Sequence, residues 1–179
     1  MVGLGDYAGA AAMFDQAEEL HPRYILETEA WRERGWINAY NDAVGPMNSG
    51  DLEAARESFG QAAAIYDGRP EALLQLGSIH SRLNLTDEAI ASFQEAIVIL
   101  EETKETQMAD TLGAPMWQEY WGIATTGLGQ TLTYAERYDE AATLYTTLLE
   151  ENPDDVGLLG SLANVLSQLG QPDSVQALY

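Results

Sequence analysis

The sequence predicts an all-α protein built as a solenoid of helix–turn–helix repeats. Three observations carry this prediction. A short motif occurs five times along the chain, and two of the intervals between its copies have the same length of 34 residues. The segments around the copies also have apolar residues at helical spacing. No segment alternates apolar and polar residues for long enough to indicate a strand, so we expect helices throughout.

The recurring motif is a turn followed by an alanine and an aromatic residue. Its first copy is Gly5-Asp6-Tyr7, followed by Ala10 and Phe14. Later copies, with substitutions, begin at Gly50, Asn84, Glu136 and Gly170. The two longer intervals exceed the 34-residue period by 11 and 18 residues. A nearly fixed period of this length is typical of a solenoid in which each repeat packs on the next.

Each copy of the motif opens a helix, and another helical stretch precedes it from the second copy on. The helical spacing is clearest in the third copy, at Ala89, Ile90, Phe93, Ala96, Ile97 and Leu100. The preceding stretch begins at Pro70, a residue suited to a first helical turn. Asn152-Pro153 is expected to end one helix, and Asp154-Asp155 to cap the next.

These residues resemble the tetratricopeptide repeat (TPR) pattern. Leu76-Gly77 and His80, followed by Ala89 and Phe93, match that pattern most fully. Other copies contribute Ala10, Phe14, Ala17 and Pro22, then Leu128-Gly129, Ala141, Tyr145 and Pro153, and finally Leu162-Ala163, Val175 and Tyr179. The resemblance covers nearly the whole chain. It implies a TPR-type α-solenoid, in which helix–turn–helix repeats form a right-handed superhelix and glycine or alanine lies where paired helices cross.

The resemblance divides the chain into one array of five parts. We expect a half repeat with only its second helix over residues 1–22 and a repeat with an extended first helix over residues 23–67. A repeat with an extended second helix or insertion follows over residues 68–114, then a complete repeat over residues 115–153 and a truncated repeat over residues 154–179. Because the first part lacks a partner helix, the sequence favours an excerpt of a longer array. The apolar face of that helix would then be exposed or covered by a neighbour, through Ala10, Met13, Phe14 and Ala17.

The residues that lengthen two repeats are predicted to be helical. Trp31 and Trp36 are expected to pack on neighbouring helices, and Pro46 to kink its helix. In the second insertion we expect a break near residues 113–115 and a long helix from Met116.

The charge of the chain excludes some partners. It carries 29 acidic and eight basic residues, a formal net charge of −21, and Lys104 is its only lysine. Such a field repels phosphate backbones and anionic lipids, so nucleic-acid binding is not expected. No segment is apolar enough for membrane insertion, and none has the pattern of a signal peptide.

The acidic residues are spread over the chain, which favours a protein of a salt-adapted, halophilic bacterium over recognition of a basic partner. The compartment, cytoplasmic or periplasmic, stays open.

The sequence offers little for catalysis. There is no cysteine, and the two histidines have structural explanations. His80 occupies an aromatic core position of the repeat, and His21 lies beside Pro22 at a helix end. No nucleophile set or calcium loop is present. We therefore expect no enzyme activity, no metal site and no cofactor.

The resemblance implies that the first helices of the repeats line a concave groove for an extended or helical peptide of a protein partner. The groove candidates are Tyr40, Asn41, Val44, Leu74, Gln75, Ser78, Thr126, Gln130 and Asn164. These positions carry no lysine or arginine, which argues against the clamp that binds a carboxylate in chaperone-binding members of the family. The amides are suited to bonding a peptide backbone. The alternative is that these polar residues only solvate an empty wall.

Two further hypotheses concern other surfaces. Trp117 and Trp121 lie at helical spacing on the second insertion and are candidates for a secondary partner contact, although a structural role is the stronger expectation. The second hypothesis is a structural function. The array would form a homodimer through exposed terminal helices, or it would pack against the rest of a larger TPR protein.

Overall fold

The computed structural model describes residues 6–110 and 113–178. Within these ranges the regular elements are all helices. They are α1 (Tyr7–Leu20), the 3-10 helix η1 (Pro22–Tyr24), α2 (Ile25–Ser49), α3 (Leu52–Ile65), α4 (Glu71–Arg82), α5 (Thr86–Ala109), α6 (Gly113–Tyr134), α7 (Tyr138–Glu151), α8 (Val156–Gln168) and α9 (Pro172–Gln176). The all-α prediction is confirmed for the described part of the chain.

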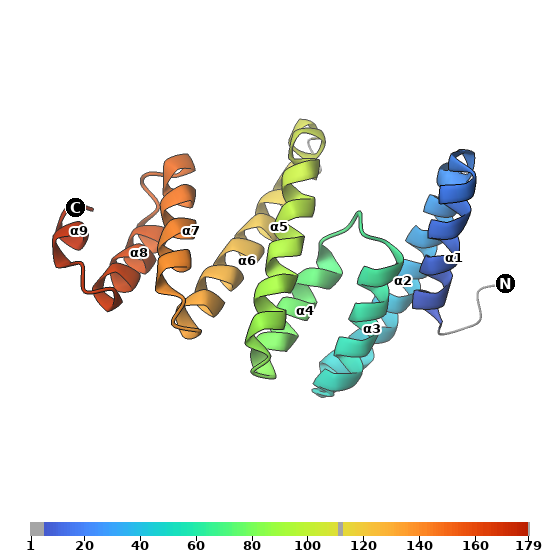
Figure 1. Cartoon of the computed structure of the whole chain (residues 1–179), viewed down its shortest axis with the longest axis horizontal. Helices are drawn as coiled ribbons and strands as arrows, with labels where there is room; N and C mark the ends of the chain where they lie inside the picture. Colours follow the sequence, from blue (N-terminus) through green and yellow to red (C-terminus); the bar gives the residue numbers. More distant parts are fainter. Residues whose placement is uncertain (1–5, 111–112, 179) are drawn as a thin grey trace.

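The helices follow one another along an elongated molecule whose described ends lie at opposite sides (Figure 1). Helices that are consecutive in the sequence pack against each other, and α4 also contacts α6 directly. We call α2, α4, α6 and α8 the first helices and α3, α5, α7 and α9 the second helices of their pairs. Each pair is one helix–turn–helix unit stacked on the next, so the predicted solenoid is confirmed.

The turn inside each pair explains the first residue of the recurring motif. Gly50, Asn84, Glu136 and Gly170 all have positive φ angles, of 80°, 59°, 59° and 70°. In each turn this residue and the next donate to carbonyls of the preceding helix, as Gly50 does to Met47 and Asp51 does to Pro46. The motif therefore begins at the residue that ends a helix in the left-handed conformation. Gly5, which opens the first copy, lies outside the described residues.

Glycines bring the helices of the centre close together around aromatic rings. A Cβ atom on Gly77 of α4 would lie 2.7 Å from the Phe93 ring of α5, and one on Gly127 of α6 would lie 2.5 Å from the same ring. A Cβ atom on Gly129 would likewise lie 2.5 Å from the hydroxyl and 2.6 Å from the ring of Tyr145 in α7. The expectation that Gly77 and Gly129 lie at close helix crossings is confirmed, and Gly127 is a third such position.

The two extended regions differ in detail from the expectation. Helix α2 continues through Pro46 to Ser49. Trp36 is buried as predicted, but Trp31 is 56% exposed, so the prediction that it packs on a neighbour is wrong. Helix α6 begins at Gly113, three residues earlier than Met116. Pro115 falls in its first turn, where the missing N–H has no helical acceptor to lose.

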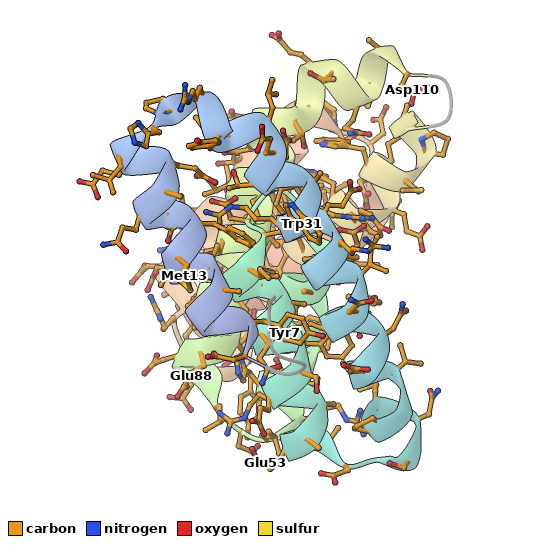
Figure 2. The ribbon with its side chains drawn as sticks, turned by 90° about the vertical axis from the view of Figure 1, so that its right-hand side faces the viewer. Tyr7, Met13, Trp31, Glu53, Glu88 and Asp110 are labelled. Atoms are coloured by element: carbon orange, nitrogen blue, oxygen red, sulfur yellow. The ribbon has the colours of Figure 1, made fainter. Side chains whose placement is uncertain are left out.

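Helix α1 packs against α2 and α3 through its buried Tyr7, Ala10 and Ala11, and a cation of α2 adds a polar contact. Arg32 of α2 has only 13% of its side chain exposed; it pairs with Asp15 at 2.5 Å and Glu18 at 3.1 Å, and it also donates to the Ile65 carbonyl. Its guanidinium lies 5.3 Å from the centre of the Phe14 ring. Thus α2 covers part of the apolar face of α1 through Arg32 rather than through Trp31. Met13 stays exposed, as the view onto this end shows (Figure 2).

Candidate functional site

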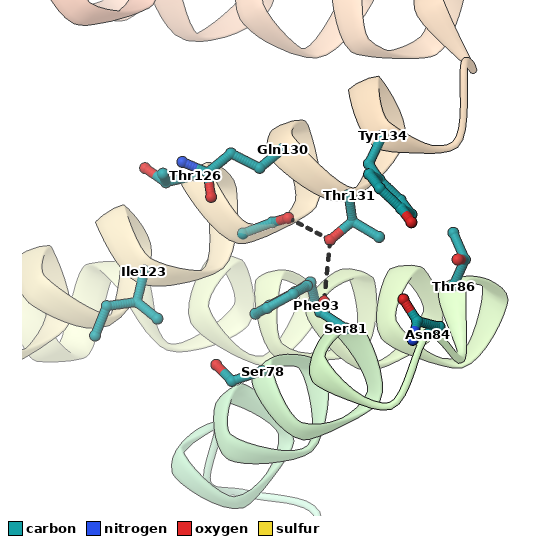
Figure 3. Close-up of a pocket in the computed structure, with 11 residues that line it drawn as sticks. Ser78, Ser81, Asn84, Thr86, Phe93, Ile123, Thr126, Gln130, Thr131 and Tyr134 are labelled. Atoms are coloured by element: carbon teal, nitrogen blue, oxygen red, sulfur yellow. Dashed lines mark hydrogen bonds between the residues drawn. The ribbon is translucent and has the colours of Figure 1, made fainter.

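A hollow of about 540 Å³ opens between the first helices α4 and α6. Its walls come from both helices, from the turn after α4 and from α5 (Figure 3). The lining residues are Ser78, Ser81, Asn84, Thr86, Phe93, Ile123, Thr126, Gly127, Gln130, Thr131 and Tyr134. None of these side chains is charged at neutral pH, so the hollow is neutral as the sequence predicts for the groove. We call it the neutral hollow.

The floor of the neutral hollow is apolar because of the glycines. Phe93 lines it although only 3% of the residue is exposed, and its ring lies against Gly77 and Gly127, which have no side chain to cover it. Ile123, 42% exposed, adds an aliphatic wall. This combination is suited to an apolar side chain of a ligand.

The hydroxyl groups around this floor are arranged as hydrogen-bond acceptors. Ser81 and Thr131 donate to the carbonyls of Gly77 and Gly127, at 2.9 and 2.7 Å, and their two oxygens lie 3.3 Å apart (Figure 3). Ser78 donates to the Leu74 carbonyl at 3.1 Å. Each hydroxyl proton is thus engaged with its own helix, while oxygen lone pairs remain for N–H groups of a ligand.

The structure brings some of the predicted groove residues together. Ser78, Thr126 and Gln130 all line the neutral hollow. Gln130 also lines a second hollow of about 330 Å³ between α6 and α8, to which Asn164 belongs. Gln130 therefore joins two hollows along the surface of the first helices.

Other predicted groove residues lie elsewhere. Leu74 is 4% exposed and belongs to the core, so its assignment as a groove anchor needs correction: it faces the helix packing rather than solvent. Tyr40 stacks on Trp36, with ring centres 4.7 Å apart, and meets Phe59 edge-on at 5.0 Å. Burial raises the pKa of the Tyr40 hydroxyl, an effect that the charge of Glu71 reinforces.

The remaining candidates of α2 and α4 are more open. Asn41 and Val44 are exposed on α2, and Gln75 is half-buried on α4 beside Tyr40. None of these three lines the neutral hollow. Their use in a groove remains a prediction.

The tryptophan pair of the insertion is mainly structural. Trp117 is 6% exposed and its indole N–H donates to the Leu100 carbonyl at 2.8 Å, which fixes α6 on α5. The burial leaves little of Trp117 for a partner, and this corrects its proposed contact role. Trp121 stacks on Trp117 at 5.2 Å and is half-buried. The Lys104 ammonium lies over both rings, at 5.6 and 5.9 Å.

Sequence reasoning missed part of the neutral hollow. The sequence places Phe93 at an aromatic position of the repeat pattern, and its spacing gives no sign that Phe93, Thr131 and Tyr134 share one hollow. A signal was present in Gly127, which follows Ile123 by one helical turn and has no side chain to cover the Phe93 ring.

Two models of tetratricopeptide repeats match the chain, over residues 47–102 and 132–179. The matched ranges include four of the turns with a left-handed residue described above. The chain belongs to the tetratricopeptide repeat family. Such repeats generally mediate protein–protein interaction, and a family of this kind is typically a non-catalytic scaffold.

One solved structure shares the fold of this TPR protein, and another matches it more weakly. The crystal structure of MamA matches with a TM-score of 0.60 and 19% sequence identity, over 97% of this chain and 85% of that one. A tetratricopeptide repeat protein from Parabacteroides merdae matches with a TM-score of 0.36 and 18% identity, over 97% of this chain and 71% of the other. No curated protein sequence matches the chain.

The described part of this TPR protein offers no cluster suited to metal chemistry. Among the described residues, no three His, Cys, Asp or Glu side chains gather closely enough to hold a metal ion. His80 bonds Ser92 at 3.1 Å between α4 and α5, and burial lowers the pKa of its imidazole. None of the described helices combines the length and apolarity needed to cross a membrane.

Proposed function

We propose that this TPR protein is a non-catalytic interaction module that binds an extended or helical peptide segment of a protein partner along its first helices. The observation that supports this proposal is the neutral hollow between α4 and α6, with the Phe93 ring as its floor and hydroxyl acceptors at its sides. An apolar side chain of the peptide would occupy the hollow, and peptide N–H groups would donate to Ser78, Ser81 or Thr131. The amides of Gln130 and Asn164 extend this polar surface toward α8.

A matched pair of substitutions tests the position of the peptide. Ile123 and Val98 are both half-exposed aliphatic residues within helices, but only Ile123 lines the neutral hollow. Peptides are first selected from a random displayed library on the wild-type chain, and their affinities are then measured by calorimetry. Ile123→Asp is expected to weaken binding at least about tenfold, about 1.4 kcal/mol. Val98→Asp is expected to change it less than about twofold.

Equal effects of the two aspartates would contradict the proposed binding surface. So would a library that yields no binding peptide under conditions in which the protein is folded.

The alternative function, self-association, is favoured by exposed apolar side chains on α1 and the first half of α2. Met13, Leu20, Leu26 and Trp31 are between 56% and 80% exposed. Sedimentation over a range of protein concentrations distinguishes the two functions. Dimers that disappear in Leu26→Ser/Trp31→Ser would support self-association, whereas a monomer that binds selected peptides supports the interaction module.

A further inference from the structure

A third hollow, of about 350 Å³, lies at the other end of the α4–α6 pair. The link between α3 and α4 and the start of α4 form one side, α5 and α6 form the other, and α2 contributes Glu33. The lining residues are Glu33, Tyr66, Gly68, Arg69, Pro70, Glu71, Leu100, Thr103, Gln107, Met116, Trp117 and Tyr120. We call it the acidic hollow.

The acidic hollow combines aromatic rings with carboxylates. The half-buried rings of Tyr66 and Tyr120 line it beside the buried Trp117, and Glu33 and Glu71 are its two acids. Further acids surround it. Burial raises the pKa of the Tyr66 hydroxyl, and the charges of Glu29, Glu33 and Asp67 act in the same direction. Burial likewise raises the pKa of Tyr120, together with the charges of Glu71 and Glu119.

The one cation that lines the hollow is already engaged with the protein. The Arg69 guanidinium lies 4.1 Å from the centre of the Trp36 ring and pairs with Glu71 at 2.7 Å. It reaches Glu33 only at 4.0 Å, and Glu33 keeps 57% of its side chain exposed. The second carboxylate oxygen of Glu71 is buried and has no hydrogen-bond partner. The two acids are therefore not neutralised by this single arginine.

We propose that the acidic hollow accepts a lysine or arginine side chain of the same partner peptide whose apolar residue occupies the neutral hollow. A cation there would lie against the faces of the tyrosine rings and pair with Glu33 at the rim. The net charge of the chain, −21, attracts basic segments to this surface and repels acidic ones. This inference rests on the proposed peptide-binding function and names the charge of the peptide.

The spacing of the two hollows gives the spacing of the two peptide residues. Glu71 lies at the start of α4 and Ser81 near its end, and each lines one hollow. On α6, Tyr120 lines the acidic hollow, and Ile123 and Gly127 follow it at helical spacing into the neutral hollow. Residues ten positions apart in a helix are separated by about 15 Å along its axis. An extended peptide spans this distance with about four or five residues.

Peptides selected from a random displayed library test the inference. We expect them to carry a lysine or arginine about four or five residues from an apolar anchor. Replacing that basic residue by glutamine should weaken binding to the wild-type chain about tenfold. Glu33→Gln should weaken binding of the basic peptide about threefold to fivefold. The control Glu95→Gln, on the exposed face of α5, should change it less than about twofold.

The outcomes separate this inference from the proposed function. Selected peptides without a basic residue at a fixed distance, or equal effects of Glu33→Gln and Glu95→Gln, would overturn the inference while Ile123→Asp still weakens binding. If Ile123→Asp also has no effect, the proposed function fails as well. A free arginine ester that binds as tightly as the peptide would assign the hollow to a small organic cation instead of a partner side chain.

Discussion

The centre of the molecule and its α1–α2 end are held together in different ways. Around α4, α5 and α6, glycines let the helices approach the Phe93 ring until no Cβ atom fits between them. At the α1–α2 end, a largely buried guanidinium joins the helices, and several large apolar side chains remain exposed. The centre is specified by local shape that repeats along the chain, whereas the end combines a few buried apolar residues with one long-range ionic contact. The two regions should therefore respond differently to salt and to substitution.

Salt tests the charge that both regions share. The net charge of −21 opposes the compact state by self-repulsion, which salt screens. We expect the melting temperature to rise by about 10 °C between low salt and molar KCl, about 3 kcal/mol for a chain of this size. Calorimetric scans at increasing KCl measure this rise, and a melting temperature indifferent to KCl would remove the explanation of the acid excess as salt adaptation. Sorbitol, which leaves charge interactions unscreened, serves as the control.

Alanine usually stabilises the interior of a helix relative to glycine, but at one central glycine we expect it to destabilise the protein. Gly127→Ala places a methyl group 2.5 Å from the Phe93 ring and is expected to lower the free energy of unfolding by about 2 kcal/mol. Gly122→Ala, one turn and a half earlier in α6, meets no atom within 4 Å and should raise it by about 0.5–1 kcal/mol. Urea denaturation of both variants makes the comparison. Equal changes would show that the helices at Phe93 are less closely packed than described.

The ionic contact at the α1–α2 end should matter locally. Arg32→Met removes the partner of Glu18 and Asp15 and the bond to the Ile65 carbonyl, at an expected cost of about 1.5 kcal/mol. We expect faster amide hydrogen exchange in α1 with little change in α4 to α6. Arg56→Met, which breaks an exposed pair with Glu53, should cost less than about 0.5 kcal/mol. Uniformly faster exchange along the chain would contradict a local role of Arg32.

The turns between paired helices give the smallest expected effect. Glu136 has a φ of 59°, a conformation that costs a side chain about 1 kcal/mol. Glu136→Gly is expected to raise the free energy of unfolding by up to about 1 kcal/mol, and Gly50→Ala, at a φ of 80°, to lower it by a similar amount. Thermal unfolding of both variants measures the difference. If Glu136→Gly lowers the free energy of unfolding, the contacts of the Glu136 side chain stabilise the fold by more than its positive φ angle destabilises it.

The sequence predicts features that repeat and misses features that occur once. The turn residues and the crossings at Gly77 and Gly129 recur at a fixed period, so their roles follow from a comparison of the copies. The contact of Arg32 with α1 and the buried indole of Trp117 join segments that no period relates. The neutral hollow follows from the sequence in part for the same reason. Helical spacing places Ser78, Thr126 and Gln130 on one surface, but the acidic hollow depends on how the link between α3 and α4 lies against the ends of α5 and α6.

A crystal structure of the chain with a selected peptide tests the central claim most directly. We expect a peptide along the α4–α6 pair, with an apolar side chain over Phe93 beside Ile123 and a basic side chain near Glu33 and Tyr120. A peptide bound on the outer surface of α3 or α5, with both hollows empty, would contradict it.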